Sequence, residues 1–232
     1  MLKQQSTTGT ATGTGRPPQL PQRASEHTLA GALEMLGAPI RFERNVEVYG
    51  EGEAAEYFYQ VVKGAVRTYK VLQDGRRQIG AFHLPGDIFG LEAGDEHSFS
   101  AEAIGDCTIR VAKRSGIVAR AARDSDVAAD LWAATAKSLR GAQEHMLLLG
   151  RKTAEERVAS FLLKMAGRSG GAGAEPTIEL PMCRQDIADY LGLTIETVSR
   201  TLTHLENTLA IELPSSRRIL LRSKASLQRL NA

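Results

Sequence analysis

The spacing of apolar residues changes along the chain, and each change predicts a different kind of structure. Leu29, Leu33 and Leu36 recur at helical spacing, which predicts a short helix over residues 26–38. From residue 40 to about residue 116, short β-rich runs alternate with glycine-containing turns, a pattern typical of a β-sandwich or barrel. The predicted strands cover residues 46–49, 57–63, 65–71, 77–83, 88–89, 99–104 and 107–112.

A longer helical period occupies residues 125–149. One seam of this helix carries residues three or four apart, and several of them are small enough to let two helix backbones approach closely. We therefore expect the helix to pair with the same helix of a second copy. The alternative is that the seam packs only against the chain's own β-rich part. The residues expected at the dimer interface are Leu131, Ala134, Ser138, Gly141, His145 and Leu148.

The C-terminal part of the chain predicts two helices separated by a tight turn. A capping box formed by Thr153 and Glu156 first indicates where a preceding helix begins. Within residues 183–206, Gly192 stands where a tight turn needs a positive φ, and Thr194 is a suitable N-cap for the helix that follows. A short helix, a tight turn and a second helix are typical of a helix-turn-helix, whose second helix fits the major groove of DNA.

The side chains near the start of this second helix suit the edges of DNA bases. Arg200 can donate two hydrogen bonds to guanine, Glu196 can accept one from cytosine, and Ser199 can bond to a base or a phosphate. The side chain of Ile195 can contact a thymine methyl group. The alternative for Glu196 and Arg200, which are four residues apart, is an ordinary ion pair on a helix surface.

Residues 211–221 predict a hairpin in which two apolar strands flank a Pro-Ser-Ser turn, and we interpret it as a wing beside the helix-turn-helix. Arginines on such a wing can contact DNA phosphates. The residues expected at the DNA backbone are Arg184, Thr194, Thr197, Arg217 and Arg218. Between residues 181 and 222, five arginines are balanced by five acidic residues, so DNA binding must depend on their placement.

Composition narrows the class of protein. The chain has 232 residues and a formal net charge of +2, which permits a nucleic-acid partner without arguing for one. No run of 18 apolar residues and no apolar signal segment is present, so we expect a cytoplasmic protein with no membrane partner. Two cysteines are too few for a disulfide framework or a cysteine-rich metal site. Residues 1–25 predict a disordered tail, and a DNA-contacting arm is the alternative.

Three motifs, in this order, resemble those of the cyclic-AMP receptor and fumarate–nitrate regulator (Crp/Fnr) superfamily of bacterial transcription factors. They are Leu-Pro-Gly-Asp-Ile-Phe-Gly at 84–90, Thr-Ala-Glu-Glu-Arg-Val-Ala-Ser-Phe-Leu at 153–162 and Glu-Thr-Val-Ser-Arg at 196–200. The last motif resembles the Fnr side of the family, which reads TTGA-type half-sites. The resemblance covers about residues 28–225 and is closest to FixK-type regulators of rhizobia, which activate genes used under low oxygen.

The resemblance implies an α+β fold and a domain plan. A tail over 1–25 precedes a β-roll over 26–122, a dimerisation helix over 123–152 and a winged helix-turn-helix over 153–232. It further implies a homodimeric, non-enzymatic activator that binds a palindromic operator in double-stranded DNA and contacts RNA polymerase. The implied role is control of genes for life at low oxygen and nitrogen fixation.

Departures from the family pattern bear on which ligand or cofactor could control the protein. Cyclic-nucleotide receptors hold the cyclic phosphate with an Arg-Ser pair, whereas this chain has His97 and Ser98 at that place. No cysteine precedes Cys107, so the iron–sulfur sensor of Fnr proteins has no ligands, and lone histidines such as His83 are poor candidates for haem. We therefore expect no cofactor, no cyclic nucleotide and activity without an effector. A ligand-gated sensor is the alternative, and a cupin-like metalloenzyme is disfavoured because the five histidines do not cluster.

Cys183 is a candidate redox switch. It lies beside Arg184 at the predicted start of the first helix of the helix-turn-helix, where a helix N-terminus and a cation favour the thiolate. Oxidation to a sulfenic or sulfinic acid would add negative charge near a DNA phosphate and weaken binding. The alternative is an unreactive small apolar residue. Cys107 lies in a predicted strand and is expected to be buried and inert.

Overall fold

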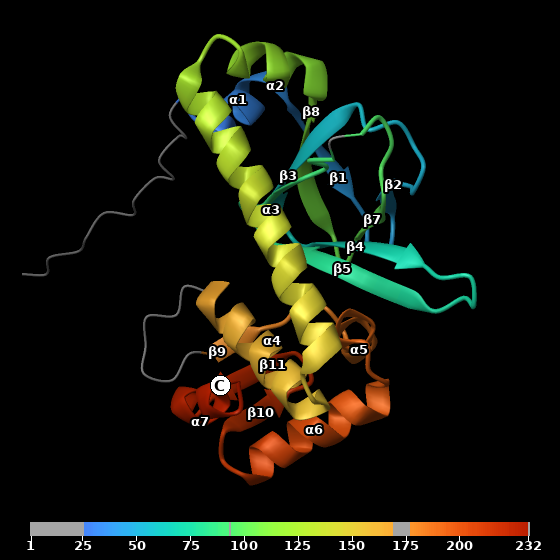
Figure 1. Ribbon diagram of the computed structural model, residues 1–232, viewed down its shortest axis with the longest axis vertical. Helices are drawn as coiled ribbons and strands as arrows, with labels where there is room; N and C mark the ends of the chain where they lie inside the picture. The colour runs from blue at the N-terminus through green and yellow to red at the C-terminus, as the bar shows by residue number, and fades with distance from the viewer. Residues whose placement is uncertain (1–25, 93, 169–176, 232) are drawn as a thin grey trace, which may run out of the picture.

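The computed structural model describes residues 26–92, 94–168 and 177–231. The tail predicted over residues 1–25 lies outside these residues. Figure 1 shows a β-rich unit, a long helix that runs beside it, and a mainly helical C-terminal unit at the other end of the long helix. The predicted fold class is therefore confirmed: an antiparallel β-roll, a long helix and a winged helix-turn-helix follow one another along the chain.

The β-roll consists of two antiparallel four-stranded sheets. One sheet has the order β1 (Ala38–Phe42), β8 (Cys107–Lys113), β3 (Tyr57–Lys63) and β6 (Ile88–Phe89). The other has the order β2 (Glu47–Tyr49), β7 (Ser100–Ala103), β4 (Val66–Val71) and β5 (Arg77–His83). Side chains from both sheets form the core between them, among them Tyr49, Tyr59, Val61, Val66, Phe89 and Ile109.

Every strand predicted in this region is present, but two elements were not predicted. Strand β1 pairs with β8 along its whole length and lies at the edge of its sheet. Pro39 is tolerated there because an edge strand leaves some backbone amides without a ladder partner. Helix α2 (Arg114–Ala121) follows β8 directly and packs with α1 (Leu29–Leu36) over the end of the roll.

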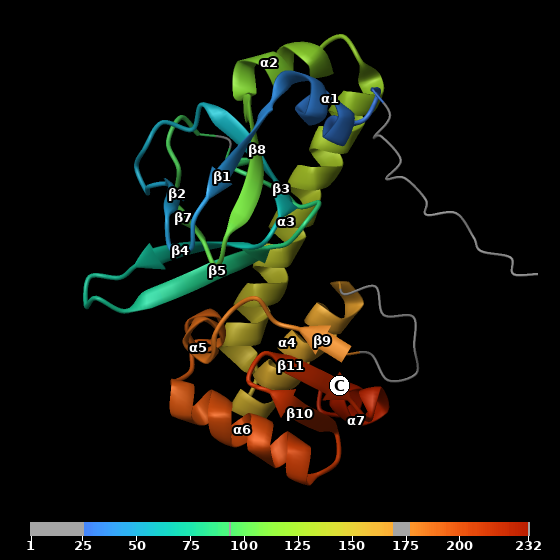
Figure 2. The same cartoon turned by 180° about the vertical axis from the view of Figure 1, so that it is seen from behind.

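The long helix α3 (Ser125–Arg151) confirms the predicted helical period. Its N-cap is Asp124, whose side chain accepts a hydrogen bond from the backbone amide of Asp126. Figures 1 and 2 show that α3 passes the β-roll and continues into the C-terminal unit. In the described part of the chain, no helix is long and apolar enough to cross a membrane.

In its described residues, the C-terminal unit contains four helices and a small sheet. Helix α4 (Ala154–Arg168) begins at the predicted capping box, where the Thr153 amide donates to Glu156 at 2.6 Å. The helices α5 (Arg184–Leu191) and α6 (Ile195–Asn207) follow β9 (Thr177–Glu179). Strands β10 (Ile211–Ser215) and β11 (Arg218–Leu221) complete an antiparallel sheet of order β10-β11-β9, and α7 (Lys224–Arg229) ends the described chain.

One apolar core joins the β-roll to the C-terminal unit. Phe82 of β5 is 5.3 Å from the ring of Tyr190 in α5 and 6.3 Å from the ring of Phe161 in α4, measured between ring centroids. All three side chains are at least 95% buried. The imidazole of His145 in α3 stacks on Tyr190 at 4.1 Å and donates from Nε2 to its backbone carbonyl at 2.7 Å. The two units are therefore packed against each other through shared side chains.

Candidate nucleic-acid interface

The turn between α5 and α6 has the geometry that the sequence predicts. Gly192 adopts φ 61°, the left-handed conformation that glycine enters without steric penalty. Arg157 in α4 holds this turn in place, since its guanidinium donates to the carbonyl oxygens of Leu191 and Leu149 at 2.9 and 2.8 Å. Thr194 caps α6 by accepting a hydrogen bond from the Thr197 amide at 3.2 Å.

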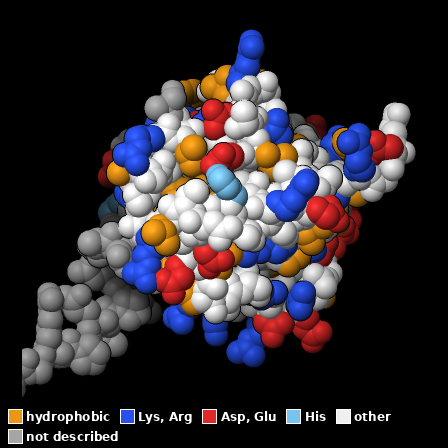
Figure 3. Space-filling model, turned by 90° about the horizontal axis from the view of Figure 1, so that it is seen from below, with side chains coloured by type: hydrophobic (Ala, Val, Ile, Leu, Met, Phe, Trp, Pro, Cys, Tyr) orange, Lys and Arg blue, Asp and Glu red, His pale blue; other side chains and the backbone are white. Residues whose placement is uncertain are grey.

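Helix α6 presents one buried face and one free face. Val198, Leu202 and Leu205 are at most 2% exposed and fix the helix to the C-terminal core. The four residues predicted to contact bases lie together on the opposite, exposed face at the start of the helix: Ile195, Glu196, Ser199 and Arg200. Figure 3 shows the end of the molecule that carries α6, where basic side chains lie around the face with acidic ones interspersed.

Glu196 can accept hydrogen bonds and Arg200 can donate them on this exposed face. Backbone amide bonding at the helix start lowers the pKa of Glu196, and the Thr194 hydroxyl and the charge of Arg200 act in the same direction. Glu196 is therefore a carboxylate at neutral pH. Arg200 donates from Nη2 to the Thr197 hydroxyl at 3.5 Å, which directs one edge of its guanidinium along the exposed face.

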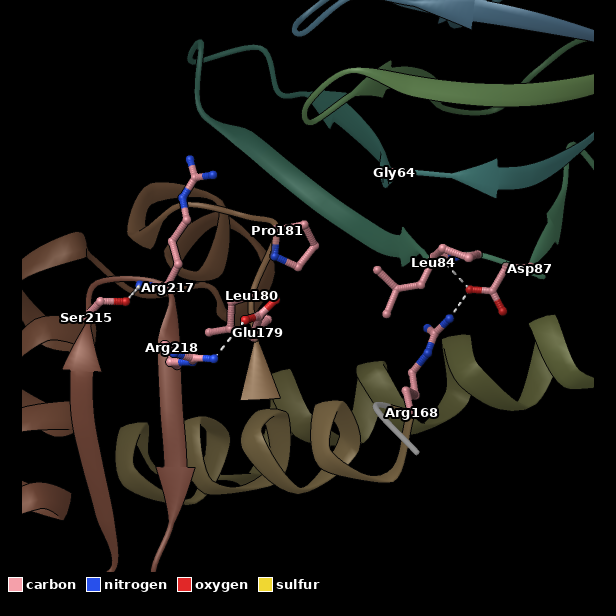
Figure 4. Close-up of a pocket in the computed structure, with 11 residues that line it drawn as sticks. Gly64, Leu84, Asp87, Arg168, Glu179, Leu180, Pro181, Ser215, Arg217 and Arg218 are labelled. Carbon is pink, nitrogen blue, oxygen red and sulfur yellow. Dashed lines mark hydrogen bonds and ion pairs between the residues drawn. The ribbon is translucent and has the colours of Figure 1, made fainter. Parts of the chain in front are cut away.

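The residues predicted to contact the DNA backbone lie in different environments. Thr194 is exposed and Thr197 half-buried at the start of α6. Arg217 is exposed at the turn between β10 and β11, and in Figure 4 it points away from Arg218, whose guanidinium pairs with Glu179 at 3.4 Å. A cavity of about 860 Å³ separates this wing from the β-roll. Across the cavity from the wing, Arg168 of α4 pairs with Asp87 of the β-roll. Arg184 is half-buried, and burial lowers its pKa.

The two cysteines lie in different environments, and the predicted burial of Cys107 is confirmed. Cys183 is the exposed N-cap of α5, and both its backbone amide and its thiol donate to Oδ2 of Asp186, at 3.2 and 3.3 Å. The thiol is thus next to a carboxylate as well as beside Arg184 in the chain. Cys107 is buried, and burial raises the pKa of its thiol to about 11, so that it stays protonated at neutral pH.

A cavity of about 720 Å³ lies between the β-roll and α3. The β-roll contributes the carboxylates of Asp87 and Glu92 to its lining, whereas Lys137 and Arg140 of α3 and Lys164 and Arg168 of α4 line the opposite side. His97, at the place of the missing cation, is buried, stacks on Tyr49 at 3.6 Å and lies 3.3 Å from the Glu92 carboxylate. His83 stacks on Phe89 at 4.7 Å, and burial lowers the pKa of His83 to about 4. Both histidines are packed side chains.

The structure corrects the predicted dimer interface at two of its six residues. His145 and Leu148 are buried within their own chain, in the core shared with the C-terminal unit. Leu131 and Ala134 pack against the cluster below α1 and α2, while Ser138 and Gly141 line the cavity beside the β-roll. Ser138 is exposed, and a Cβ added at Gly141 would meet nothing within 4 Å, so dimer contact at these two small residues stays a prediction.

A different face of α3 is apolar and uncovered. Trp132, Leu139 and Met146 are 76%, 60% and 66% exposed, and they recur at intervals of seven residues. Leu147, next to Met146, is 58% exposed. Apolar residues at a seven-residue interval on a long helix are typical of a helix that pairs with another helix. This face carries large apolar side chains, so the predicted seam of small residues does not include it.

Sequence analysis also missed a polar network between β4–β5 and α5. Arg67 and Arg77 of the β-roll both donate to Oδ1 of Asp186, at 2.9 and 2.7 Å. Arg77 donates in addition to Asp189 at 2.8 Å, and the Gln78 amide donates to the Asp189 carbonyl at 2.8 Å. The only local signal is that Asp186 stands at the third position of its helix, where a carboxylate caps the N-terminus.

Comparison with known proteins places these features in a family. Residues 39–124 match the model of the cyclic nucleotide-binding domain, and residues 156–230 match that of the Crp-like helix-turn-helix domain. The chain is 55% identical over 205 residues to the nitrogen fixation regulation protein FixK of Azorhizobium caulinodans, covering 88% of this chain and 83% of that protein. It is 42% identical over 190 residues to the transcriptional activatory protein AadR of Rhodopseudomonas palustris, covering 81% and 80%.

A solved structure agrees with the sequence comparison. The fold superposes on FixK2 from Bradyrhizobium japonicum with a TM-score of 0.81 and 54% sequence identity, covering 85% of this chain and 98% of that chain. The resemblance found from the three sequence motifs is therefore confirmed.

Proposed function

Since the chain belongs to the Crp/Fnr family of DNA-binding transcription regulators, among its FixK-type members, we propose that it activates transcription as a homodimer bound to a TTGA-type palindrome, without a small effector. In this proposal residues 26–122 act as the β-roll domain, 123–152 as the dimerisation helix and 153–232 as the DNA-binding domain. The family consists of regulators rather than enzymes. By analogy with its FixK relatives, the genes that it controls serve nitrogen fixation and growth at low oxygen. In this proposal the protein activates them through contacts with RNA polymerase.

The observation that carries this proposal is the exposed face at the start of α6. This face carries a guanidinium with two donors, a carboxylate, a hydroxyl and an apolar side chain, from Arg200, Glu196, Ser199 and Ile195 in that order. These groups lie within two turns of one helix and suit base edges in the major groove. Arg184, Thr194, Thr197, Arg217 and Arg218 are proposed to hold the DNA backbone around that face. Two copies related by twofold symmetry would place two such helices about one helical turn of DNA apart.

Effector-free activity is supported by the residue that stands at the place of the missing cation. A cyclic phosphate is held by a fixed cation, and the place of that cation is taken by His97, which is buried against Tyr49 and Glu92. We therefore expect the purified protein to bind a TTGA-N6-TCAA duplex in reductant with no ligand added, measured by fluorescence anisotropy. Binding that appears only when a cyclic nucleotide is added would favour the ligand-gated alternative instead.

The dimer is proposed to form through the apolar face of α3 that carries Trp132, Leu139 and Met146. Replacing Leu139 by glutamate would bury a charge at a helix pair, so we expect the dimer to dissociate and DNA binding to fall with it. Sedimentation velocity would show the parent at twice the mass of the variant. Val118→Glu on α2, where Val118 is 50% exposed, is the matched control and should leave the dimer intact. A Leu139→Glu protein that remains dimeric would place the interface elsewhere.

Oxidation of Cys183 is proposed to switch DNA binding off. Hydrogen peroxide transfers one oxygen to the thiolate and leaves hydroxide, giving a sulfenic acid, and a second equivalent gives the sulfinic acid. The product adds negative charge beside the Asp186 carboxylate, 3.3 Å from the sulfur, and near the DNA phosphate that the proposal places there.

The redox proposal predicts different responses of two serine variants. We expect peroxide to weaken DNA binding by the parent and by Cys107→Ser, since Cys107 is buried and protonated. Cys183→Ser should keep its affinity through the same treatment, because serine is not oxidised by peroxide. Anisotropy titrations before and after peroxide measure this. Equal loss in Cys183→Ser and in the parent would contradict the switch.

A further inference from the structure

The contact between the β4–β5 hairpin and α5 combines buried charges with a shared apolar core. Figures 1 and 2 show α5 directly beneath this hairpin. We define the clamp as Arg67, Arg77 and Gln78 of the hairpin together with Asp186, Asp189 and the backbone carbonyl of Tyr190 in α5. Behind it, Phe82 packs on Tyr190 and Phe161, so polar and apolar contacts hold the same two elements together.

The charges of the clamp are paired, and they are buried at Arg67 and Asp186 and half-buried at Arg77 and Asp189. Asp186 is 2% and Arg67 7% exposed, and Arg67 also pairs with Glu102 of its own sheet. Arg77 donates from Nε to Asp189, and its Nη2 lies 2.7 Å from a carboxylate oxygen of both Asp186 and Asp189, which fixes the angle of the guanidinium as well as its position. Such a fork tolerates little rotation of α5 against the β-roll.

Asp186 connects the clamp to the DNA-binding face. Its Oδ1 accepts the two arginines, while its Oδ2 accepts the backbone amide of Cys183 and so caps α5. Helix α5 in turn contacts α6 through the turn at Gly192. The direction of α6 relative to the β-roll and α3 is thus determined by contacts within one chain.

We propose that the clamp is the device that holds α6 in its DNA-binding orientation without a ligand, and that Arg77 and Gln78 are positioning residues for DNA recognition. The inference rests on the proposed function, since it needs a dimer that reads a palindrome. Two recognition helices read two half-sites together only if both hold the required direction at the same time. If loss of the clamp left about a tenth of each DNA-binding unit correctly oriented, both would be correct in about one dimer in a hundred, and the apparent affinity would fall about 100-fold.

The first test compares Arg77→Met with Arg76→Met in the full-length protein. Arg76 is the neighbouring arginine, 78% exposed and paired with Asp74 within the hairpin, so its replacement removes the same charge without touching α5. We expect Arg77→Met to weaken binding to the TTGA-N6-TCAA duplex at least tenfold and Arg76→Met less than twofold. Equal affinities of the two variants would overturn the proposal.

Salt dependence separates positioning from direct DNA contact. If Arg77 acts by orienting α6, the slope of log affinity against log salt stays at the parent value while affinity falls. A slope reduced by about 0.9 per lost contact would mean that Arg77 binds a phosphate itself, which would also overturn the proposal.

Operator spacing gives a readout that simple destabilisation would not change. Inserting one base pair into the spacer shifts the second half-site by about 3.4 Å along the helix axis and rotates it. The parent should bind the N6 duplex much more tightly than the N7 duplex, whereas Arg77→Met should discriminate less between them. The milder variant Gln78→Glu, which places a charge against two backbone carbonyls without removing volume, should show the same loss of discrimination.

A double variant completes the test. Asp189→Asn removes the negative charge that pairs with Arg77. A protein with both Arg77→Met and Asp189→Asn should therefore bind the duplex no more weakly than Arg77→Met alone. Additive losses would show that the two residues act separately and would contradict the clamp. Failure of the parent to bind any TTGA palindrome would instead reject the proposed function, so the two failures are distinguishable.

Discussion

Replacing Arg200 by alanine is expected to weaken binding to the palindrome by about 2–6 kcal/mol, or about 30-fold to 10⁴-fold, because a bidentate arginine–guanine contact contributes about 1–3 kcal/mol and the dimer makes two. Arg200 lies exposed on the free face of α6, so the variant should fold as the parent does. Anisotropy titrations at fixed salt measure the change. Loss of the contact should also relax the base preference at the guanine of each TTGA half-site.

Arg217→Ala provides the matched control for Arg200→Ala. Arg217 is an exposed arginine at the wing turn and is proposed to contact a phosphate. Its loss should weaken binding to all sequences alike and lower the salt slope by about one per protomer. Changing the TTGA guanine to adenine should weaken the parent but barely affect Arg200→Ala. An Arg200→Ala protein that still prefers guanine would show that another residue reads that position.

Replacing Phe161 by alanine is expected to destabilise the protein by about 3–5 kcal/mol, since a fully buried phenylalanine leaves a cavity when it is truncated. Phe161 is 1% exposed and contacts Phe82 of the β-roll and Tyr190 of α5. At about 2–4 °C per kcal/mol for a chain of this size, the melting temperature should fall by about 6–20 °C. Differential scanning calorimetry measures the shift.

Phe161→Leu is the control for this prediction, because it keeps most of the buried volume and should lose much less stability. Because Phe161 packs against both units, Phe161→Ala should lower the cooperativity of unfolding as well as its midpoint. A fall in melting temperature no larger than that of Phe161→Leu would show that the surrounding side chains close the cavity.

The helix-turn-helix could be predicted from the sequence because its signals are local. Gly192 needs a left-handed backbone, Thr194 caps the next helix, and apolar residues at helical spacing mark the buried face. Each of these constraints acts within a few residues. The strands of the β-roll were predictable for the same reason, since turn residues separate them.

The elements that were missed depend on partners distant in the sequence or on weak local patterns. Strand β1 contains Pro39, a signal against a strand, which its edge position overrides. Helix α2 has one buried residue, Ile117, and therefore no apolar stripe that a periodicity search detects.

The assignment of His145 and Leu148 to a dimer interface failed for a related reason. A helix with two apolar faces gives two seams, and the sequence does not state which of them the chain's own domains cover. Leu148 belongs to the covered seam and Leu139 to the open one. The clamp was equally hidden, because charged residues such as Arg77 and Asp189 are usually placed on solvated surfaces.

Asp186 can pair with its arginine partners only late in protein synthesis. Its carboxylate pairs with arginines that precede it by 119 and 109 positions, and a chain leaves the ribosome N-terminal end first. Until Asp186 emerges, Arg67 has only Glu102 as a described carboxylate partner, and the surface that α5 covers is open to water. A chain truncated before Asp186 would keep that surface exposed, so unfinished chains would carry an apolar and positively charged patch on the β-roll that complete chains cover.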